Sequence, residues 1–355
     1  MISLDFWKNK KVFITGNTGF KGSWLSQWLL HLGAEIKGFA LEPEKLSLFN
    51  ILELSDCYET VTADIRDQDT LFKAVSQFMP DIIIHMAAQP LVRSSYLEPV
   101  KTLETNILGT IYINEIARKI NNLSCILNVT TDKVYENDES GKQYQENDRL
   151  GGFDPYSTSK ACSELISSTF NNSFFLINNQ VSSCVARSGN VIGGGDFSED
   201  RIIPDLYRAM ENHSILKIRN PNSVRPWQHV LDPLSGYLLL VEKQFDEGKE
   251  LASPFNFGPL DNSCISVQDL VNEMINCSNL KLEIEYLTQS DNELHESNLL
   301  SLDCSKARKL LRWSPKLSIQ ETAKLTIDWY TSFRENLNMK EFTIKQIKNY
   351  QREIA

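Results

Sequence analysis

The chain has 355 residues, of which 41% are hydrophobic and 23% charged, and its formal net charge is −10 at pH 7. This composition is typical of a globular protein of one or two domains, and the acidic balance disfavours nonspecific binding to nucleic acid or to anionic membranes. No apolar run approaches the roughly 20 residues of a membrane-spanning helix, and the N-terminus lacks the apolar core of a signal peptide, so neither a membrane nor a nucleic-acid partner is expected.

Short apolar runs alternate with amphipathic segments through the first half of the chain. The expected strands lie at residues 12–15, 35–40, 58–62, 82–85, 125–130 and 181–187. The expected helices lie between them, at residues 23–32, 67–78, 99–119 and 155–171. Because consecutive parallel strands are joined by crossover helices, the alternation predicts an α/β fold with a Rossmann-like doubly wound parallel sheet.

The pattern changes after Arg187, where stretches bearing glycine and proline interrupt it. Further helices are expected at residues 202–211, 232–245, 267–275 and 319–335. We therefore expect a Rossmann domain over residues 1–187, rejoined by part of 224–260, and a smaller mixed α/β C-terminal domain over most of 188–355. Since ligands of open α/β sheets bind at the carboxyl ends of the strands, the second domain should cover a substrate there.

The cysteines are odd in number and scattered, with no Cys-x-x-Cys pair. They are Cys57, Cys125, Cys162, Cys184, Cys264, Cys277 and Cys304. This usage is typical of reduced thiols in the cytoplasm, and differs from a disulfide framework or a zinc site. The five histidines show no metal-ligand spacing either, so no metal is expected.

The first expected strand runs directly into Gly16-x-x-Gly19-x-x-Gly22, and an expected helix follows. Gly16 permits a tight bend, Gly19 lets the backbone approach a pyrophosphate, and Gly22 lets helix and strand pack closely. The N-terminus of the helix would then face the phosphates. A glycine trio alone also fits a purely structural turn, but the strand before it and the helix after it favour dinucleotide binding.

Residues after the next strands support the same site. Asp64 and Ile65 follow the third strand, where a carboxylate could accept a hydrogen bond from an adenine amino group. Ala87 and Ala88 follow the fourth strand with the small side chains that a backbone against a cofactor needs. Glu42 lies where an acid could bind the ribose diol, although a solvated loop acid explains it equally well. No arginine there would bind a 2′-phosphate, so the sequence favours NAD.

A second motif places chemistry beside this site. Tyr156 and Lys160 are four residues apart on an expected helix and share one face. A cationic Lys160 beside the phenol would lower the pKa of Tyr156 towards neutrality, whereas the motif alone also fits a surface helix. Thr131, Asp132 and Lys133 follow a buried strand, where a Rossmann active site is built, although a turn or cap role is the alternative.

Together these motifs resemble the extended short-chain dehydrogenase/reductase family over nearly the whole chain. The matching segments are Gly16-x-x-Gly19-x-x-Gly22, Asp64-Ile65, Ala87-Ala88, Asn106-x-x-Gly109-Thr110, Thr131, Tyr156 with Lys160, and Arg225-Pro226-Trp227-Gln228-His229-Val230. Within that family the chain is most similar to the nucleotide-sugar 4,6-dehydratases. Segments 19–24, 131–133, 187–196 and 225–229 closely resemble the branch whose substrate is CDP-glucose. We read Asn106 as structural.

The resemblance implies a three-step reaction on bound NAD. Tyr156 would take the proton of the C4 hydroxyl as hydride leaves C4, and Thr131 would hydrogen-bond the C4 oxygen. Water would leave across C5 and C6, with Asp132 as the acid of raised pKa, before hydride returns to C6. Lys133 stands where many dTDP- and GDP-sugar dehydratases carry a glutamate base for the C5 proton. The CDP-glucose branch shares this lysine, and the base stays open.

The resemblance also assigns ligand contacts. Those at the cofactor are Gly16, Thr18, Gly19, Phe20, Lys21, Gly22, Asp64, Ile65, Ala87, Ala88, Gln89, Thr130, Tyr156, Lys160 and Arg187. Those at the nucleotide sugar are Arg93, Asn190, Arg208, Arg225, Trp227 and Asn256. Solvated surface is an equal alternative for Arg93 and Arg208, and core packing is the stronger reading for Trp227. The family pairs two helices per subunit, here 99–119 and 155–171, which implies a homodimer or homotetramer.

Three other functions stay open. A nucleotide-sugar 4-epimerase or decarboxylase would share Tyr156 and Lys160 but would not need an acid such as Asp132. A dehydratase could act on a dTDP- or GDP-hexose instead. A noncatalytic dinucleotide sensor could keep the fold, although such proteins typically lose the tyrosine or the lysine.

Overall fold

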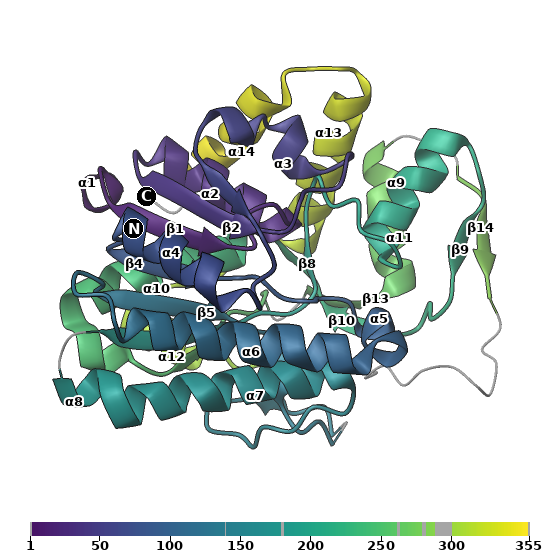
Figure 1. Cartoon of the computed structure of the whole chain (residues 1–355). Coiled ribbons are helices and arrows are strands. Elements are labelled where there is room, and N and C mark those ends of the chain that lie inside the picture. The colour runs from purple at the N-terminus through teal and green to yellow at the C-terminus, as the bar shows by residue number, and fades with distance from the viewer. Residues whose placement is uncertain are drawn as a thin grey trace.

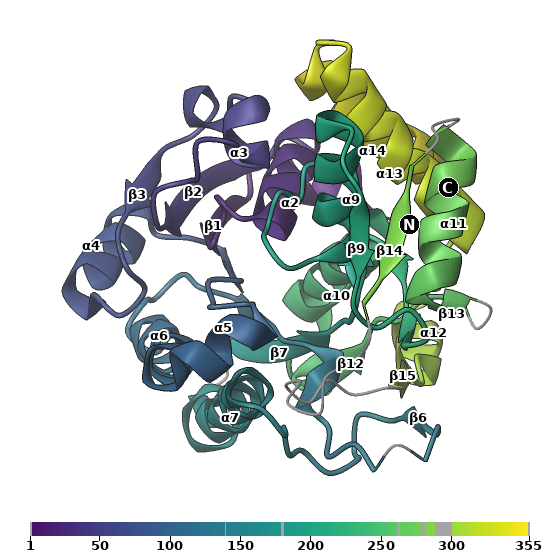
Figure 2. The same cartoon turned by 90° about the vertical axis from the view of Figure 1, so that its right-hand side faces the viewer.

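The computed structural model describes residues 2–138, 140–178, 181–260, 263–278, 282–287 and 300–353. At its centre lies a sheet of seven strands, each parallel to its neighbours (Figures 1 and 2). In spatial order the strands are β12 (Pro254–Asn256), β7 (Ser182–Arg187), β5 (Cys125–Val129), β4 (Ile82–His85), β1 (Lys11–Thr15), β2 (Glu35–Ala40) and β3 (Thr60–Thr62). The order reverses between β1 and β4, which confirms the expected doubly wound sheet and its switch point.

Helices cover both faces of this sheet, and further helices accompany the small sheets of the second half of the chain. They are α1 (Leu4–Trp7), α2 (Phe20–His31), α3 (Leu48–Ile51), α4 (Gln68–Phe78), α5 (Val92–Leu97), α6 (Pro99–Ala117), α7 (Pro155–Phe170), α8 (Leu176–Asn178), α9 (Ile202–Asn212), α10 (Leu231–Glu247), α11 (Val267–Ser278), α12 (Ser305–Leu311), α13 (Ile319–Arg334) and α14 (Met339–Glu353). Shorter turns are the 3₁₀ segments η1 (Leu54–Asp56), η2 (Asp132–Val134) and η4 (Gly248–Leu251), and the π-helical η3 (Asn171–Phe175).

The alternation of side chains along β1 explains the two layers. Val12 and Ile14 join one buried cluster with α2, α10 and α14, whereas Phe13 joins the other with α4 and α6. The strand is therefore apolar on both faces, as strands of a parallel sheet between helices must be. Figure 1 shows α6 and α7 side by side below the sheet, and α13 and α14 on the opposite side near α2.

Helix starts follow local capping chemistry. Asp67 and Asp154 cap α4 and α7 by accepting from backbone N–H groups three residues on. The helix α2 begins at Phe20, earlier than the expected residue 23, because Gly19 takes the cap position in an extended conformation. Lys21 therefore lies in the first helical turn. The sequence analysis did not expect α14, which packs on α2 through the rings of Trp28 and Tyr350, 5.8 Å apart.

The second half of the chain adds small two-stranded sheets. Their strands are β6 (Gln143–Tyr144) with β15 (Ser301–Leu302), β8 (Val191–Ile192) with β11 (Gln228–His229), β9 (Leu216–Ile218) with β14 (Ile284–Tyr286), and β10 (Val224–Pro226) with β13 (Cys264–Ser266). Figure 2 shows β9 and β14 beside α9 and α11, away from β3. The strand β12 returns to the large sheet beside β7. The division at residue 187 stays a prediction.

Along the described part of the chain, no helix is both long and apolar enough to cross a membrane. The same residues contain no cluster of three His, Cys, Asp or Glu side chains that could hold a metal ion. All seven cysteines are free thiols.

The buried acid Glu242 joins the N-terminal helix α1 to α10. The carboxylate of Glu242 on α10 accepts hydrogen bonds at Oε1 from Ser3 N (2.9 Å) and Trp7 Nε1 (2.6 Å). Burial raises the pKa of Glu242 from 4.5 to about 7. Since the folded-state pKa lies above the unfolded one, ionisation of Glu242 costs stability, and this cost develops as pH rises from about 4.5 to about 7.

We expect Glu242→Gln to raise the melting temperature at pH 8 by a few degrees, because a glutamine Oε1 keeps both hydrogen bonds without the buried charge. Melting curves of both proteins between pH 5 and pH 8 check this, and the gain should shrink towards pH 5. The exposed Glu250→Gln serves as control. A gain that does not change with pH would contradict the proposed role of the buried charge.

Candidate active site

The glycine turn lies at the carboxyl end of β1, next to the switch point. Gly16 has a φ of +74°, and a Cβ there would lie 2.7 Å from Ala87 N; a Cβ on Gly22 would lie 2.8 Å from Asn17 Cα. Both positions therefore require glycine for close packing. Around Gly19 the nearest atom to a Cβ is 3.4 Å away, and Gly19 gives α2 no side-chain cap. The first-turn N–H groups are thus suited to bind a phosphate.

The ends of β1 and β4 are held together by one hydroxyl. Thr15 Oγ1 accepts from Met86 N and Ala87 N, both at 3.1 Å, and shares a 2.7 Å hydrogen bond with His85 Nδ1. Burial, helped by the charge of Lys160, lowers the pKa of His85 to about 3. A neutral imidazole therefore supports the backbone that faces the glycine turn.

Thr131, Asp132 and Tyr156 meet where β5 ends and α7 begins. Thr131 Oγ1 donates to Asp132 Oδ1 at 3.0 Å, and Thr131 lies close enough to Tyr156 to act on the pKa of its phenol. Asp132 is 2% exposed, and burial raises its pKa, against the charge of Lys133, the Thr131 hydrogen bond and the charge of Arg225. The structure therefore brings a buried carboxyl group of raised pKa and a phenol together around Thr131.

The expected effect of Lys160 on Tyr156 is wrong for this structure. Burial raises the pKa of Tyr156 to about 12, with opposing contributions from the Thr131 hydrogen bond and from Arg201. The Lys160 ammonium instead donates to Val129 O at 3.0 Å, and burial lowers its pKa to about 8. Lys160 thus anchors the end of β5 rather than the phenol.

Lys21 reaches across from the first turn of α2 to the end of β7. Its Nζ lies 3.4 Å from Ser188 Oγ. Burial of the amine lowers its pKa to about 7, and the charges of Lys160 and Arg201 act in the same direction while Asp132 opposes them. Lys21 is therefore a titratable group between the glycine turn and the acid.

Three of the residues expected to contact ligands form a buried structural cluster. The Arg187 guanidinium is 1% exposed and pairs with Glu164, with Nε 2.9 Å from Oε1. Glu164 also accepts from Thr130 Oγ1 at 2.6 Å. The Tyr135 hydroxyl accepts from Arg187 and donates to Asn256 Oδ1 at 2.7 Å. The polar atoms of Arg187, Thr130 and Asn256 are thus engaged by protein groups.

Other residues expected at the cofactor also have protein partners. Asp64 accepts from Arg66 at both carboxylate oxygens, and this lowers the pKa of Asp64. Gln89 accepts from Leu91 N and donates to Thr102 Oγ1 at 2.8 Å. The structural role read for Asn106 is confirmed, since it binds Gln89 N at 2.8 Å and Ser159 Oγ at 2.8 Å.

The remaining positions at this edge differ in exposure. Ile65 is buried against Gly109, Thr18 donates to Leu41 O at 3.1 Å, and Glu42 is exposed beyond β2. Phe20, on the first turn of α2, and Ala88, after β4, are half-buried. The exposure of Glu42 is compatible with a ribose contact and with a solvated loop acid, so both readings stay open.

The residues expected at the substrate stand on several separate elements of the fold. Arg225 on β10 lies close enough to Asp132 to lower that pKa. Asn190 turns the chain after β7 with a φ of 45°. Trp227 is 6% exposed and donates from Nε1 to Ile265 O at 3.2 Å, which favours the core-packing reading. Arg93 is half-buried on α5.

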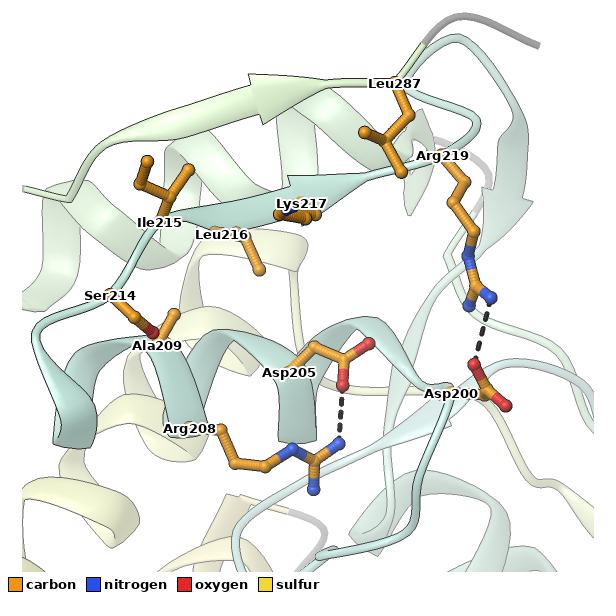
Figure 3. A pocket seen from close by; sticks show the side chains of 10 residues that line it. All are labelled: Asp200, Asp205, Arg208, Ala209, Ser214, Ile215, Leu216, Lys217, Arg219 and Leu287. Carbon is orange, nitrogen blue, oxygen red and sulfur yellow. Dashed lines mark hydrogen bonds and ion pairs between the residues drawn. The ribbon is translucent and has the colours of Figure 1, made fainter. Parts of the chain in front are cut away.

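Arg208 lies apart, on α9, at a cavity of about 330 Å³ between α9 and β9 (Figure 3). It pairs with Asp205 and donates to Phe197 O at 3.1 Å. Figure 3 also shows Arg219 reaching Asp200, at 2.9 Å. Both guanidinium groups are balanced by a carboxylate, so the cavity carries paired charges rather than a net positive field.

Four further residues lie at the site that were not expected there from the sequence. Ser188 and Gly189 follow β7 and lie against Lys21 and Asp132. Tyr237 on α10 shares a 2.6 Å hydrogen bond with Ser188 Oγ, and Arg201 acts on both Lys21 and Tyr156. Their places depend on tertiary packing, and only the Arg187-Ser188-Gly189-Asn190 segment carried a sequence signal.

Comparisons with known proteins show the family of the chain. A model of the GDP-mannose 4,6 dehydratase family matches residues 13–326. The chain is 43% identical to the CDP-glucose 4,6-dehydratase of Salmonella typhimurium strain LT2, over 99% of this chain and 98% of that protein.

Solved structures show the same fold. The dTDP-glucose 4,6-dehydratase of Bacillus anthracis, determined in complex with NAD, matches with a TM-score of 0.76 and 21% identity over 92% of this chain and 98% of that one. The UDP-glucuronic acid 4-epimerase of Bacillus cereus matches with a TM-score of 0.76 and 22% identity, over 91% and 99% of the two chains. Because the family model spans most of the sequence and the Salmonella relative nearly all of it, the chain belongs to the GDP-mannose 4,6 dehydratase family of extended short-chain dehydrogenases/reductases.

Proposed function

We propose that the chain dehydrates CDP-D-glucose to CDP-4-dehydro-6-deoxy-D-glucose with bound NAD, as a step of deoxysugar synthesis for surface polysaccharides such as O-antigen. The observation that carries this proposal is the place of Thr131, which donates to Asp132 and lies close enough to Tyr156 to act on the pKa of its phenol. It supplies a phenol for C4 and an acid for the leaving hydroxyl in one place. The choice of CDP-glucose rests on the Salmonella relative.

The residues present fit NAD. The glycine turn approaches Ala87 closely, and the uncapped N-terminus of α2 can take the diphosphate. Gly16, Gly19 and Gly22, with Lys21 beside them, would hold that group, and Tyr156 and Lys160 would face the nicotinamide riboside. When bound, NAD supplies the hydride acceptor for C4 and the donor for C6.

Tyr156 would take the proton of the C4 hydroxyl, and Thr131 would hydrogen-bond the C4 hydroxyl. Burial opposes formation of the phenolate, since it raises the pKa of Tyr156, whereas Arg201 favours it. Lys160 orients the site through Val129 O. Tyr156 can accept the C4 proton only after its own phenolic proton has left, so binding of substrate and cofactor must lower the Tyr156 pKa for this step.

Asp132 would protonate the C6 hydroxyl as water leaves. Its buried carboxyl has a raised pKa, so it holds a proton at a pH where an exposed aspartate has lost it. Lys133 follows Asp132 on η2 and is one candidate for removal of the C5 proton, the other being a further group that acts through water. The nucleotide diphosphate would contact Arg225, Asn190 and Arg208. Most of the nucleotide-sugar-binding domain would come from residues 188–355.

Purified protein incubated with CDP-glucose, and separately with dTDP-, UDP- and GDP-hexoses, tests the function. We expect loss of one water mass and alkali-induced absorbance of a 4-keto-6-deoxy sugar from CDP-glucose alone. Turnover of another nucleotide sugar would keep the mechanism and overturn the substrate. Interconversion of C4 epimers without loss of mass would replace the dehydratase by an epimerase.

Lys21 should link cofactor binding to pH. A diphosphate beside the amine raises its pKa above the value of about 7 that it has in the structure, so NAD binding takes up a proton above that pH. We expect the NAD affinity to fall as pH rises above 7, by up to about tenfold per pH unit. Calorimetry in two buffers of different ionisation enthalpy measures the proton directly.

The variant Lys21→Gln should lose most of this proton uptake and bind NAD with an affinity that depends little on pH. The exposed Lys45→Gln is the matched control and should behave as the parent protein. Equal proton uptake by the parent protein and Lys21→Gln would assign the titration to another group.

We propose a homodimer, or a tetramer of dimers, that pairs α6 and α7 of two subunits in the cytoplasm. Apolar side chains stand exposed on and beside these helices: Leu97 is 82%, Val100 66% and Leu165 58% exposed. Exposed apolar side chains along these helices support their use as an interface. Light scattering of the parent protein and of Leu165→Glu tests this face.

A further inference from the structure

Gly189 follows β7 directly and lies against the carboxylate of Asp132. A Cβ built on Gly189 would overlap Asp132 Oδ2 and Cγ, and it would lie 2.6 Å from Oδ1. No side chain fits at this position while Asp132 keeps its place. The φ of Gly189 is not in the left-handed region, so the requirement for glycine comes from the carboxylate and not from the backbone.

The backbone around Gly189 cannot easily move away. Gly189 O accepts from Gln228 Nε2 at 3.0 Å, and Asn190 O accepts from Gln228 N at 3.3 Å. One residue earlier, Ser188 O accepts from Asp132 N at 3.4 Å. Gln228 is itself 1% exposed. A side chain on Gly189 would therefore displace the Asp132 carboxylate rather than the main chain.

The carboxylate is also fixed by the hydroxyl of Thr131, at 3.0 Å from Oδ1. Rotation of Asp132 away from Gly189 would break this hydrogen bond and separate the acid from the threonine that also contacts Tyr156. A shift of about 1 Å at a reacting group commonly costs two orders of magnitude in rate.

We propose that Gly189 is a positioning residue, whose missing side chain forms the space that holds the Asp132 carboxyl in line for protonation of the leaving hydroxyl. A side chain there would leave oxidation at C4 intact and disable the loss of water. The inference rests on the proposed dehydration and assigns to Gly189 the geometry of its acid step.

The test compares Gly189→Ala with Asp132→Asn and with Gly151→Ala, a control whose Cβ would lie 3.3 Å from the side chain of the exposed Glu136. Single-turnover absorbance follows cofactor reduction, and mass spectrometry follows the loss of water. We expect Gly189→Ala to slow water loss at least about 100-fold and C4 oxidation by no more than a few-fold. Gly151→Ala should match the parent protein. Unchanged water loss in Gly189→Ala would overturn the inference.

Two further outcomes keep the test decisive. If Asp132→Asn still loses water at the parental rate, the acid assignment in the proposed function fails, whatever Gly189→Ala does.

If Gly189→Ala is too unstable to assay, melting curves in the Asp132→Ala background decide, because the shortened side chain removes the overlap. There Gly189→Ala should cost far less in melting temperature than in the parent. An equal cost in both backgrounds would show that the contact does not exist.

Discussion

Asp132→Asn should separate the oxidation of the sugar from its dehydration. An asparagine has the shape of the aspartate and can still accept from Thr131 through Oδ1, so the pocket beside Gly189 stays filled. It carries no proton that can pass to a leaving hydroxyl. We therefore expect a loss of about 10³-fold in turnover, within the range for removal of a general acid, with oxidation at C4 nearly unchanged.

Rapid mixing with CDP-glucose should then show cofactor reduction at the parental rate, followed by a stable absorbance instead of its return. The exposed Asp56→Asn is the control and should turn over as the parent protein does. If Asp132→Asn loses cofactor reduction as well, Asp132 acts on C4 or on binding, and its assignment as the acid is wrong.

The position of Asp132 at the site was predictable from the sequence because of where the residue stands along the chain. Residues directly after a buried parallel strand lie at one edge of the sheet, so the order of the expected strands and helices alone places Thr131 and Asp132 beside the glycine turn. The glycines were predictable for the same reason, and the positive φ of Gly16 agrees with the bend expected of it.

The contact between Asp132 and Gly189 was not predictable. It joins the ends of β5 and β7, which pair in the sheet but are separated in the sequence by a helix. A single sequence shows neither the pairing nor the direction of a side chain at a strand end. The shift of the Tyr156 pKa was missed for a related reason, since desolvation depends on the whole environment and not on the spacing to Lys160.

Arg187 was expected at the cofactor, but the sequence does not show which group its charge pairs with. The residue stands at the carboxyl end of β7, which is the edge of the sheet where the cofactor is expected. A position at the cofactor was therefore a reasonable prediction. The side chain, however, pairs with Glu164 of α7, and both are almost completely buried, at 1% and 2% exposure. The type of a residue cannot show whether its charge serves a ligand or another buried charge.

The buried pair gives the largest stability effect that we expect. Arg187→Met leaves the Glu164 carboxylate without its partner in the interior and also removes a donor to the Tyr135 hydroxyl. Loss of one member of a buried pair typically costs about 3–5 kcal/mol in the free energy of unfolding. Urea unfolding followed by tryptophan fluorescence measures the change.

The double variant Arg187→Met/Glu164→Gln removes both charges, and its Gln Oε1 can keep the hydrogen bond from Thr130. It should therefore recover more than half of the lost stability. The exposed pair of Lys324 and Asp328 on α13 is the control, since Lys324→Met should cost only about 0.3–0.5 kcal/mol. A double variant that is less stable than Arg187→Met would contradict the argument. The NAD affinity of the double variant then tests whether Arg187 also contacts the cofactor. If the folded double variant binds NAD as tightly as the parent protein, NAD binding does not depend on this guanidinium.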